Sequence, residues 1–433
     1  MTVATYTIGC KVNQYETEAI LEMFLKKGYE VVPFGEKADV YIINTCSVTQ
    51  MSDSKNRQVI RKCHRLNPDA VVAVMGCYSQ VAPEEVAQIE GVDIILGTQN
   101  RANLLDMAEK LLEQRGIKDE PTVNVKATDF KEELPYEELS ISKFEGHTRA
   151  FVKIQDGCSQ FCTYCIIPYA RGPIRSRTLE SISSEIEQIA NRGFLEAVLV
   201  GIHLASFGKD LDSDAITLKD AVSVASSVEK IKRVRLGSLD PMYLSEDIIK
   251  ALSENEKFCR HFHLSLQSGC DSVLKRMNRK YTTDEYMDIV NLIRKYMPDC
   301  AITTDIMVGF PGETEEEFLE SLEFVRKVGF ARIHVFPFSP RKGTVAYKMK
   351  DQVLNSVKKE RVDRMIALGQ ELEQSFLNQM VGKVTDVLCE KDLAGYTGNY
   401  VKVVVNEGDF KEGEIIPVMI TGVNGNECIG ERI

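Results

Sequence analysis

The chain has 433 residues, of which 44% are hydrophobic and 27% are charged, and it contains no low-complexity tract. This composition is typical of a globular protein that is long enough for two or three hydrophobic cores. The formal net charge of −11 excludes a simple polycation that coats nucleic acid. We recognise no secretory signal and no apolar run long enough to cross a membrane, so we expect a cytoplasmic protein with no membrane partner. Its twelve cysteines are then expected to be reduced and available to metals.

Strand and helix patterns alternate over residues 2–114. The expected strands are Ala4–Ile8, Ala38–Ile43, Ala70–Val74 and Asp93–Leu96, and the expected helices are Gln14–Lys27, Ser54–Leu66, one opened by Pro83, and Ala102–Glu113. Such alternation predicts an α/β domain with right-handed crossovers and a doubly wound parallel sheet. Residues 115–143 break the alternation with prolines and a run of glutamates, so we expect a linker there.

The alternation resumes over residues 144–374. The expected strands are Ala150–Ile154, Ala197–Val200, Val234–Leu239, His261–Gln267, Ala301–Val308 and Arg332–Phe338, separated by helices such as Ser181–Arg192, Asp284–Tyr296 and Glu315–Lys327. Six βα units predict an open (βα)6 partial barrel. Its site is expected at the carboxyl ends of the strands.

The pattern changes again over residues 376–433, after a long helical stretch that ends near Gln379. Short alternating strands are expected at Lys383–Leu388, Tyr400–Val405, Ile415–Ile420 and Glu427–Ile429. Turns rich in glycine and asparagine separate them. We therefore expect a small antiparallel β-barrel.

Cys158, Cys162 and Cys165 form a C-x3-C-x2-C pattern directly after the first expected strand of the partial barrel. No fourth cysteine or histidine is near them along the chain. Three thiolates can hold three corners of an iron–sulfur cube and leave one iron open to another ligand. Structural zinc, the alternative, needs four ligands and usually takes them from two C-x2-C pairs. The spacing therefore favours a [4Fe-4S] cluster.

Three further cysteines, Cys10, Cys46 and Cys77, each end an expected strand of the N-terminal sheet. The carboxyl ends of adjacent parallel strands meet in one crevice, so these thiols can form a second three-cysteine site. The alternative is that they are buried small hydrophobic residues. We assign the remaining six cysteines to packing.

The sequence around both cysteine sets resembles the radical S-adenosylmethionine (SAM) methylthiotransferases over nearly the whole chain. The matching motifs are Gly9-Cys10-Lys-Val-Asn13-Gln14-Tyr15-Glu16, Asn44-Thr45-Cys46-Ser-Val48, Gly76-Cys77, and the run from Asp156 through Cys165 to Gly172. The resemblance implies an auxiliary [4Fe-4S] cluster on Cys10, Cys46 and Cys77. It implies a second [4Fe-4S] cluster with SAM on Cys158, Cys162 and Cys165, and an RNA-binding TRAM domain at the C-terminal end.

The resemblance also implies the reaction. One SAM methylates a sulfur on the auxiliary cluster, and a second SAM is cleaved to a radical that removes hydrogen from C2 of an adenine, which then receives the methylthio group. Clusters and SAM carry this chemistry, so the catalytic side chains are unknown. The implied partners are tRNA and a low-potential electron donor of the flavodoxin or ferredoxin type, and we expect a monomer.

The words after Cys10, Lys11-Val12-Asn13-Gln14-Tyr15, resemble the branch that modifies N6-threonylcarbamoyladenosine beside the tRNA anticodon (position 37), the MtaB type. The alternatives within the family are isopentenyladenosine in tRNA and an aspartate of a ribosomal protein. From other classes, a radical methylase or a noncatalytic metal-containing RNA-binding protein remains open. A threonyl carboxylate needs a cation, and we expect it from the stretch Arg171–Arg177.

SAM contacts are expected mainly at strand ends. The candidates are Tyr164, Gly201, Ser238, Gln267, Ser268, Arg279, Asp305 and Gly309, each of which has an alternative as a turn, cap or core residue. The C-terminal segment holds nine acidic residues (Asp386 to Glu431) against five basic ones (Lys383 to Arg432). We therefore expect electrostatic binding of RNA to rest more on Arg332–Arg364, with nine basic and three acidic residues.

Overall fold

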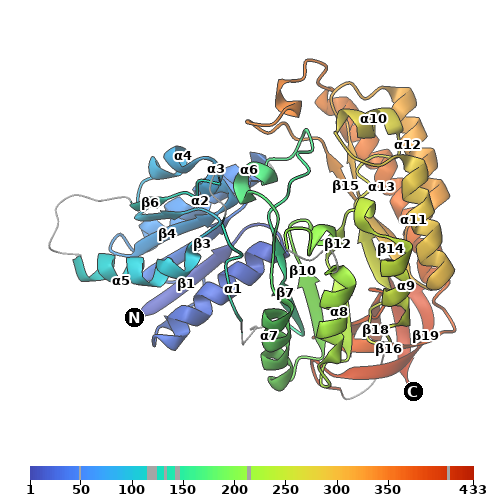
Figure 1. Ribbon diagram of the computed structural model, residues 1–433, viewed down its shortest axis with the longest axis horizontal. Helices are drawn as coiled ribbons and strands as arrows, with labels where there is room; N and C mark the ends of the chain where they lie inside the picture. Colours follow the sequence, from blue (N-terminus) through green and yellow to red (C-terminus); the bar gives the residue numbers. More distant parts are fainter. Residues whose placement is uncertain (48–49, 115–123, 131–133, 142–146, 212–215, 407–409) are drawn as a thin grey trace. The chain divides into compact units, whose positions relative to one another are not determined.

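The structure is a computed structural model that describes residues 1–47, 50–114, 124–130, 134–141, 147–211, 216–406 and 410–433 (Figure 1). It falls into two compact units. Unit 1 comprises residues 1–144, 155–177 and 339–347, and unit 2 comprises residues 145–154, 178–338 and 348–433. The cysteine loop after residue 157 thus belongs to unit 1, together with the N-terminal sheet. The domain bounds expected from the sequence stay a prediction.

Unit 1 contains a parallel sheet in the order β2-β1-β3-β4-β5-β6 (Figure 1). Its strands are β1 (Thr2–Thr7), β2 (Glu30–Val31), β3 (Val40–Thr45), β4 (Val71–Gly76), β5 (Ile94–Leu96) and β6 (Asn124–Lys126). Its helices are α1 (Lys11–Lys26), α2 (Gln50–Leu66), α3 (Cys77–Val81), α4 (Pro83–Ala87), the 3₁₀ turn η1 (Arg101–Asn103) and α5 (Leu104–Gln114). Every residue of β3 and β4 is buried, as in central strands covered on both faces. The doubly wound sheet is confirmed.

Part of the expected linker is ordered on unit 1. β6 pairs with β5 at the edge of the sheet. Further along, the Tyr15 hydroxyl donates to the carbonyl of Leu139, and Ile141 is fully buried. This packing is hard to predict from the sequence, because its apolar positions are isolated among glutamates. Residues 115–123, 131–133 and 142–143 of the expected linker lie outside the described residues.

Unit 2 carries the open partial barrel, which is confirmed. Two parallel sheets, β11-β10-β7 and β12-β13-β14-β15, continue each other because β11 and β12 are separated only by Gly237. The strands are β7 (Arg149–Lys153), β10 (Glu196–Val200), β11 (Arg233–Leu236), β12 (Ser238–Leu239), β13 (His261–Leu264), β14 (Ala301–Val308) and β15 (Arg332–Pro337). The helices are α7 (Leu179–Asn191), α8 (Leu218–Ser227), α9 (Glu246–Glu254), α10 (Asp271–Arg276), α11 (Thr283–Tyr296), α12 (Glu315–Val328) and α13 (Asn355–Asn378).

The chain ends in a closed barrel in the order β16-β17-β18-β20-β19. Its strands are β16 (Val384–Cys389), β17 (Ala394–Thr397), β18 (Lys402–Val405), β19 (Ile415–Asn424) and β20 (Glu427–Arg432). Strand β17 was not expected from the sequence, because its glycine weakens a strand pattern. Gly395 is needed there, since a Cβ would clash with the Leu388 carbonyl oxygen. The pairs are antiparallel except β18 with β20.

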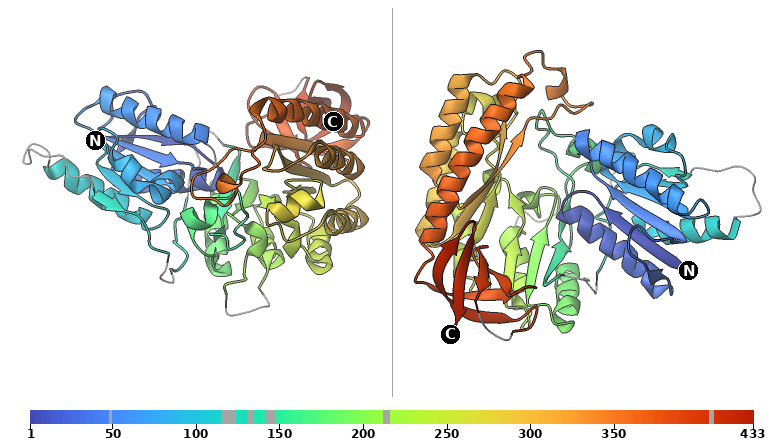
Figure 2. Two further views of the ribbon diagram at one scale, coloured as in Figure 1. Left: turned by 90° about the horizontal axis from the view of Figure 1, so that it is seen from above. Right: turned by 180° about the vertical axis from the view of Figure 1, so that it is seen from behind.

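Helix α13 packs along β15 and leads into the terminal barrel (Figure 2). The barrel docks on the amino ends of the unit 2 strands. Arg233 donates to the carbonyls of Asp386 (2.6 Å) and Tyr396 (2.9 Å). The ring of Tyr400 lies over the Arg235 guanidinium, with 4.7 Å to the ring centroid. Among the described residues, no helix is both long and apolar enough to cross a bilayer.

Candidate functional site

Cys10, Cys46 and Cys77 lie at the carboxyl ends of three adjacent strands. Cys10 is the N-cap of α1 after β1, Cys46 follows β3, and Cys77 begins α3 directly after β4. Because β3 pairs with both β1 and β4, these ends are neighbours. The Cys10 and Cys46 thiols are also near enough to affect the pKa of Cys77. The predicted convergence is therefore present, and iron binding by these thiols stays a prediction.

Two residues shape this edge of the sheet. Gly76 has a φ of 102°, and a Cβ there would clash with Asn44 Oδ1. A glycine is thus required directly before Cys77. Asn13 donates to the carbonyls of Ile8 (3.1 Å) and Thr45 (3.0 Å), and its Oδ1 lies 3.5 Å from Cys10 Sγ. It fastens the strand ends that carry Cys10 and Cys46.

The chemistry of the three thiols fits an iron–sulfur cube. Burial raises the pKa of Cys77 to about 12, and the charge of Arg171 opposes this rise. Iron would supply the further positive charge that a buried thiolate needs. Among the described residues, no group of three or more His, Cys, Asp or Glu is compact enough to hold a single metal ion. That finding is compatible with a cube, which holds its ligands further apart than one ion does.

The second cysteine set lies on a loop between β8 (Gln155–Asp156) and α6 (Ile167–Arg171). All three thiols are partly exposed. The Cys158 amide donates to the Gly172 carbonyl, and the Cys165 amide donates to the Cys162 carbonyl, both at 3.0 Å. These bonds hold the backbone of the loop at both ends of the cysteine motif. The arrangement suits a cluster that must accept an outside ligand.

A buried ion network holds both cysteine segments within unit 1. Arg171 is fully buried, and its Nη2 donates to Asn13 Oδ1 (2.8 Å) and Glu16 Oε2 (3.1 Å). Its Nη1 donates to Asp156 Oδ1 (3.3 Å), two residues before Cys158. Arg101, also fully buried, pairs with Glu16, and with Glu137 at 2.6 Å. One arginine therefore connects the segment after Cys10 with the segment before Cys158.

The prediction that the stretch Arg171–Arg177 supplies a cation for the substrate carboxylate is wrong. Arg171, Arg175 and Arg177 are all buried, and each already has a protein partner. Arg175 donates to the carbonyls of Pro173 and Arg171 (both 2.9 Å), and Arg177 pairs with Glu138 (3.1 Å). The sequence stretch looked available because it follows an exposed loop, whereas its charges balance buried carboxylates.

In unit 2, most of the predicted SAM contacts lie at the carboxyl ends of the strands. Gly201 follows β10, Ser238 begins β12, and Gln267 and Ser268 follow β13. Asp305 lies in β14 and Gly309 follows it. Gln267 has a φ of 68°, and its amide donates to the Asp305 carbonyl (2.9 Å). Tyr164 lies on the cysteine loop of unit 1. Their binding of SAM stays a prediction.

Two of these candidates have clear structural roles. Gly309 has a φ of 71°, and its amide donates to the buried carboxylate of Glu313 (2.8 Å). A Cβ at Gly309 would clash with Cγ of Lys358. Asp305 pairs with His263 at 3.1 Å between Oδ2 and Nε2. Packing therefore accounts for the glycine at 309.

Arg279, another predicted SAM contact, belongs to a polar cluster around Asp240 at the same end of the strands, and sequence reasoning missed the other members of this cluster. Asp240 accepts from Arg279 (2.6 Å) and lies 3.6 Å from His203 Nε2. Burial disfavours its charged form, but the nearby His203 ring and the charge of Arg279 outweigh burial, so the pKa of Asp240 is below its usual value. The His203 ring meets Tyr243 edge-on at 5.6 Å. The sequence signal for His203 and Asp240 was their position shortly after the strands β10 and β12.

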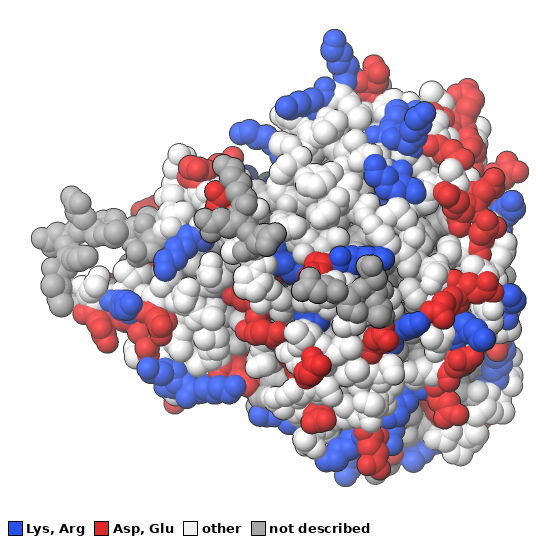
Figure 3. Space-filling model, viewed as in Figure 1, with Lys and Arg blue, Asp and Glu red and all other residues white. Residues whose placement is uncertain are grey.

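Several basic residues of the segment Arg332–Arg364 are engaged within the protein, and its binding of RNA stays a prediction. Arg361 pairs with Glu313 (2.7 Å) and Arg364 with Glu315 (2.6 Å). Lys358 is buried and donates to the Phe338 carbonyl (3.0 Å). On the face shown in Figure 3, several basic side chains lie close together at the upper edge, and basic and acidic side chains are interspersed over the rest. Counting charges along the sequence could not reveal these pairs.

Two family models match the chain. Residues 152–325 match the radical SAM superfamily, and residues 2–97 match the uncharacterized protein family UPF0004. The two matches cover the two cysteine sets separately.

Curated relatives match nearly the whole chain. The threonylcarbamoyladenosine tRNA methylthiotransferase MtaB of Bacillus subtilis is 43% identical over 428 residues, covering 97% of this chain and 93% of that protein. The protein of the same name from Aquifex aeolicus is 39% identical, with 97% and 100% covered. A tRNA-2-methylthio-N(6)-dimethylallyladenosine synthase of Thermoanaerobacter sp. is 37% identical, with 89% and 81% covered.

Solved structures agree on the fold. The radical SAM methyltransferase TsrM from Kitasatospora setae gives a TM-score of 0.54 at 16% identity, covering 78% of this chain and 75% of that one. The cobalamin-dependent SAM radical enzyme OxsB gives 0.52 at 13% identity, with 84% and 56% covered. These identities support a shared fold alone. Given the full-length relatives and the two cysteine sets at loop and strand ends, the chain belongs to the radical-SAM methylthiotransferase family.

Proposed function

We propose that this protein installs a methylthio group on C2 of N6-threonylcarbamoyladenosine, beside the anticodon of tRNA. The observation that carries the proposal is full-length similarity to proteins named for that reaction, at 39% to 43% identity. The motif after Cys10, from Lys11 to Tyr15, supports the branch of the family that acts on threonylcarbamoyladenosine. The buried network that joins the two cysteine segments supports the use of both sets in one reaction.

A second candidate is methylthiolation of dimethylallyladenosine. A synthase for that reaction is 37% identical to this chain, close to the values for the first group. The two substrates differ in charge: the threonyl group carries a carboxylate, and the dimethylallyl group is apolar. A buried carboxylate needs a cation or backbone donors, so a site made for one substrate rejects the other. Relative rates on the two tRNAs therefore separate the candidates.

In the proposed reaction, Cys10, Cys46 and Cys77 hold one [4Fe-4S] cluster, and Cys158, Cys162 and Cys165 hold another. When bound, the clusters and SAM supply the methylthio group and a radical able to break an unactivated C–H bond. The chain itself positions these groups. Arg171 and Asn13 fix the cysteine segments, and the polar groups at the strand ends of unit 2 orient SAM.

We further propose that the protein works in the cytoplasm as a monomer and receives electrons from a flavodoxin or ferredoxin.

A bacterial strain that lacks its own threonylcarbamoyladenosine methylthiotransferase offers a test of the proposed reaction. Expression of this chain is expected to restore the 2-methylthio nucleoside, measured by mass spectrometry of digested tRNA. Restoration by the wild type, but not by Cys46→Ala or Cys158→Ala at equal expression, supports the proposal. No restoration by the wild type would contradict it.

A further inference from the structure

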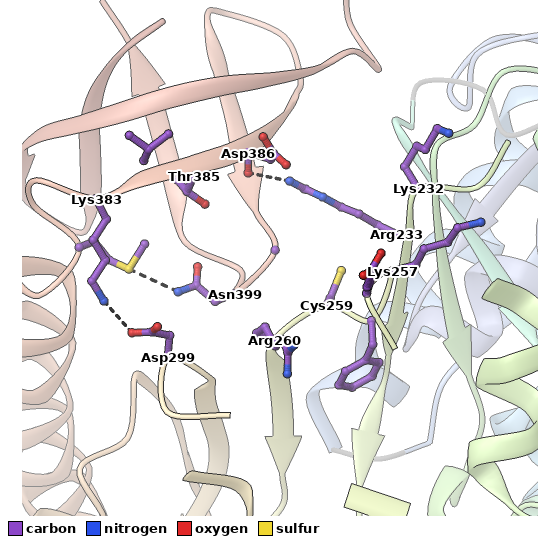
Figure 4. Close-up of a pocket in the computed structure, with 15 residues that line it drawn as sticks. Lys232, Arg233, Lys257, Cys259, Arg260, Asp299, Lys383, Thr385, Asp386 and Asn399 are labelled. Carbon is purple, nitrogen blue, oxygen red and sulfur yellow. Dashed lines mark hydrogen bonds and ion pairs between the residues drawn. The ribbon is translucent and has the colours of Figure 1, made fainter. Parts of the chain in front are cut away.

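A cleft of about 340 Å³ lies within unit 2, between the amino ends of the strands and the terminal barrel (Figure 4). One wall comes from the loops before β11, β13 and β14, and the other from the start of β16 and the turn after β17. These are the strand ends opposite to Gly201 and Ser268. The cleft is therefore separate from the predicted SAM contacts.

Cations dominate the wall formed by the strand loops. Lys232, Arg233, Lys257 and Arg260 line it, against Glu256 and Asp299 on the same loops. Arg233 is used for docking, since it donates to two carbonyls of the terminal barrel. Within the described part of the chain, none of Lys232, Lys257 and Arg260 forms an ion pair with a carboxylate, in contrast to the paired arginines of α13.

Lys232 and Lys257 also repel each other. Lys257 is held by the carbonyls of Ser226 (2.7 Å) and Val228 (2.9 Å). Burial lowers the pKa of Lys257, and the positive charge of Lys232 lowers it further. An anion between the two amines would relieve this repulsion. These carbonyls accept two of the three N–H donors of the Lys257 amine, so one donor is left for such a ligand.

The opposite wall is polar and suits a sugar–phosphate chain. Thr385, Gly398 and Asn399 contribute to it beside one carboxylate, Asp386, and Lys383 is already paired with Asp299 at 2.8 Å (Figure 4). The volume is large enough for a phosphate with its sugar and far too small for a folded domain. Strand β14 has eight residues, so the cleft lies about 26 Å from the carboxyl ends. The arm of a folded tRNA is long enough to span that distance.

We propose that this cleft binds the backbone phosphates of the substrate tRNA, through cations supplied by the partial barrel, with the terminal barrel as its polar wall. The inference rests on the proposed function, because it takes tRNA as the partner. It explains how a terminal barrel with an excess of acidic residues can border an RNA site. Lys232, Lys257 and Arg260 provide charge there, without reading bases.

The test compares two double variants in the full-length, cluster-loaded protein. Lys232→Ala/Lys257→Ala removes the two cleft amines. The matched control, Lys219→Ala/Lys295→Ala, removes one lysine from α8 and one from α11, which are paired with Asp247 and Glu246 of α9. Binding of tRNA that carries threonylcarbamoyladenosine is measured by filter retention from low to moderate salt. For each phosphate that the variant no longer neutralises, the slope of log K against log salt is expected to fall by about 0.7 to 0.9.

The cleft variant is expected to bind tRNA several-fold more weakly, with a shallower slope, while the control matches the wild type. KM for tRNA is expected to rise at unchanged kcat, and SAM cleavage without tRNA to stay unchanged. An unchanged slope in the cleft variant would overturn the proposal. A wild type that binds tRNA tightly but modifies a different nucleoside would refute the proposed function and leave the cleft intact.

Discussion

Replacing Arg171 with glutamine is expected to destabilise unit 1 severely. Three arginines, Arg101, Arg171 and Arg175, balance three carboxylates, Glu16, Glu137 and Asp156, in the buried network. Removing one arginine leaves two positive charges against three negative ones. The uncompensated carboxylate lies where neither Arg171 nor Glu16 has any exposed side-chain surface.

The burial of both partners decides the magnitude. An exposed ion pair contributes about 0 to 1 kcal/mol, whereas breaking a buried pair costs about 3 to 5 kcal/mol. The larger figure applies here, and it is a large fraction of the roughly 5 to 15 kcal/mol that stabilises a typical domain. Arg171→Lys is expected to lose less, because it keeps the charge but cannot span Asn13, Glu16 and Asp156 as a planar guanidinium does.

Urea unfolding of the apoprotein measures this loss without any contribution from clusters. The double variant Arg171→Gln/Glu16→Gln restores equal numbers of charges, so it is expected to be more stable than Arg171→Gln alone. A loss below about 1 kcal/mol for Arg171→Gln, or no recovery in the double variant, would refute the reasoning from buried charge.

Three further outcomes are expected. Cys46→Ala should retain reductive SAM cleavage but lose methylthio transfer, while Cys158→Ala should lose both; equal loss in the two variants, measured by release of 5′-deoxyadenosine, would contradict separate roles. Truncation after Gln379 should impair SAM cleavage as well as tRNA binding, because Arg233 loses the two carbonyls that it contacts in the terminal barrel and unit 2 is destabilised. A truncated protein with wild-type thermal stability would argue against that docking. A hydrogen bond from Arg276 lowers the pKa of Glu317 to about 2, so its stabilising contribution is present above about pH 4.3 and is lost as the pH falls towards 2. Arg276→Gln should flatten this acid dependence of unfolding, and an unchanged profile would exclude the pair as its source.

The fold was predictable where hydrophobic periodicity is strong. The strands of both parallel sheets are buried runs, and their alternation with helices leaves few topologies. The strand ends then placed Cys10, Cys46 and Cys77 together without any distance information. Short elements were missed because their patterns are weak: β2 has two residues, and β17 contains Gly395.

Charge was the least predictable property from the sequence. Arg171 and Arg361 look like surface cations along the chain, yet both are buried against glutamates from distant segments. Conversely, Lys232 and Lys257 precede different strands, and no sequence pattern indicates that they share a cleft. Pairing of charges depends on tertiary contacts, whereas periodicity reports only which residues are buried.

A competition between two tRNAs tests most directly whether threonylcarbamoyladenosine is the substrate. The purified enzyme, reconstituted with iron and sulfide under anaerobic conditions, would receive equal amounts of tRNA bearing threonylcarbamoyladenosine and tRNA bearing dimethylallyladenosine, with SAM and a low-potential reductant. Mass spectrometry of the digested nucleosides would then measure both products. We expect the 2-methylthio derivative of threonylcarbamoyladenosine to form in large excess. Equal or preferential modification of dimethylallyladenosine would contradict the proposed substrate.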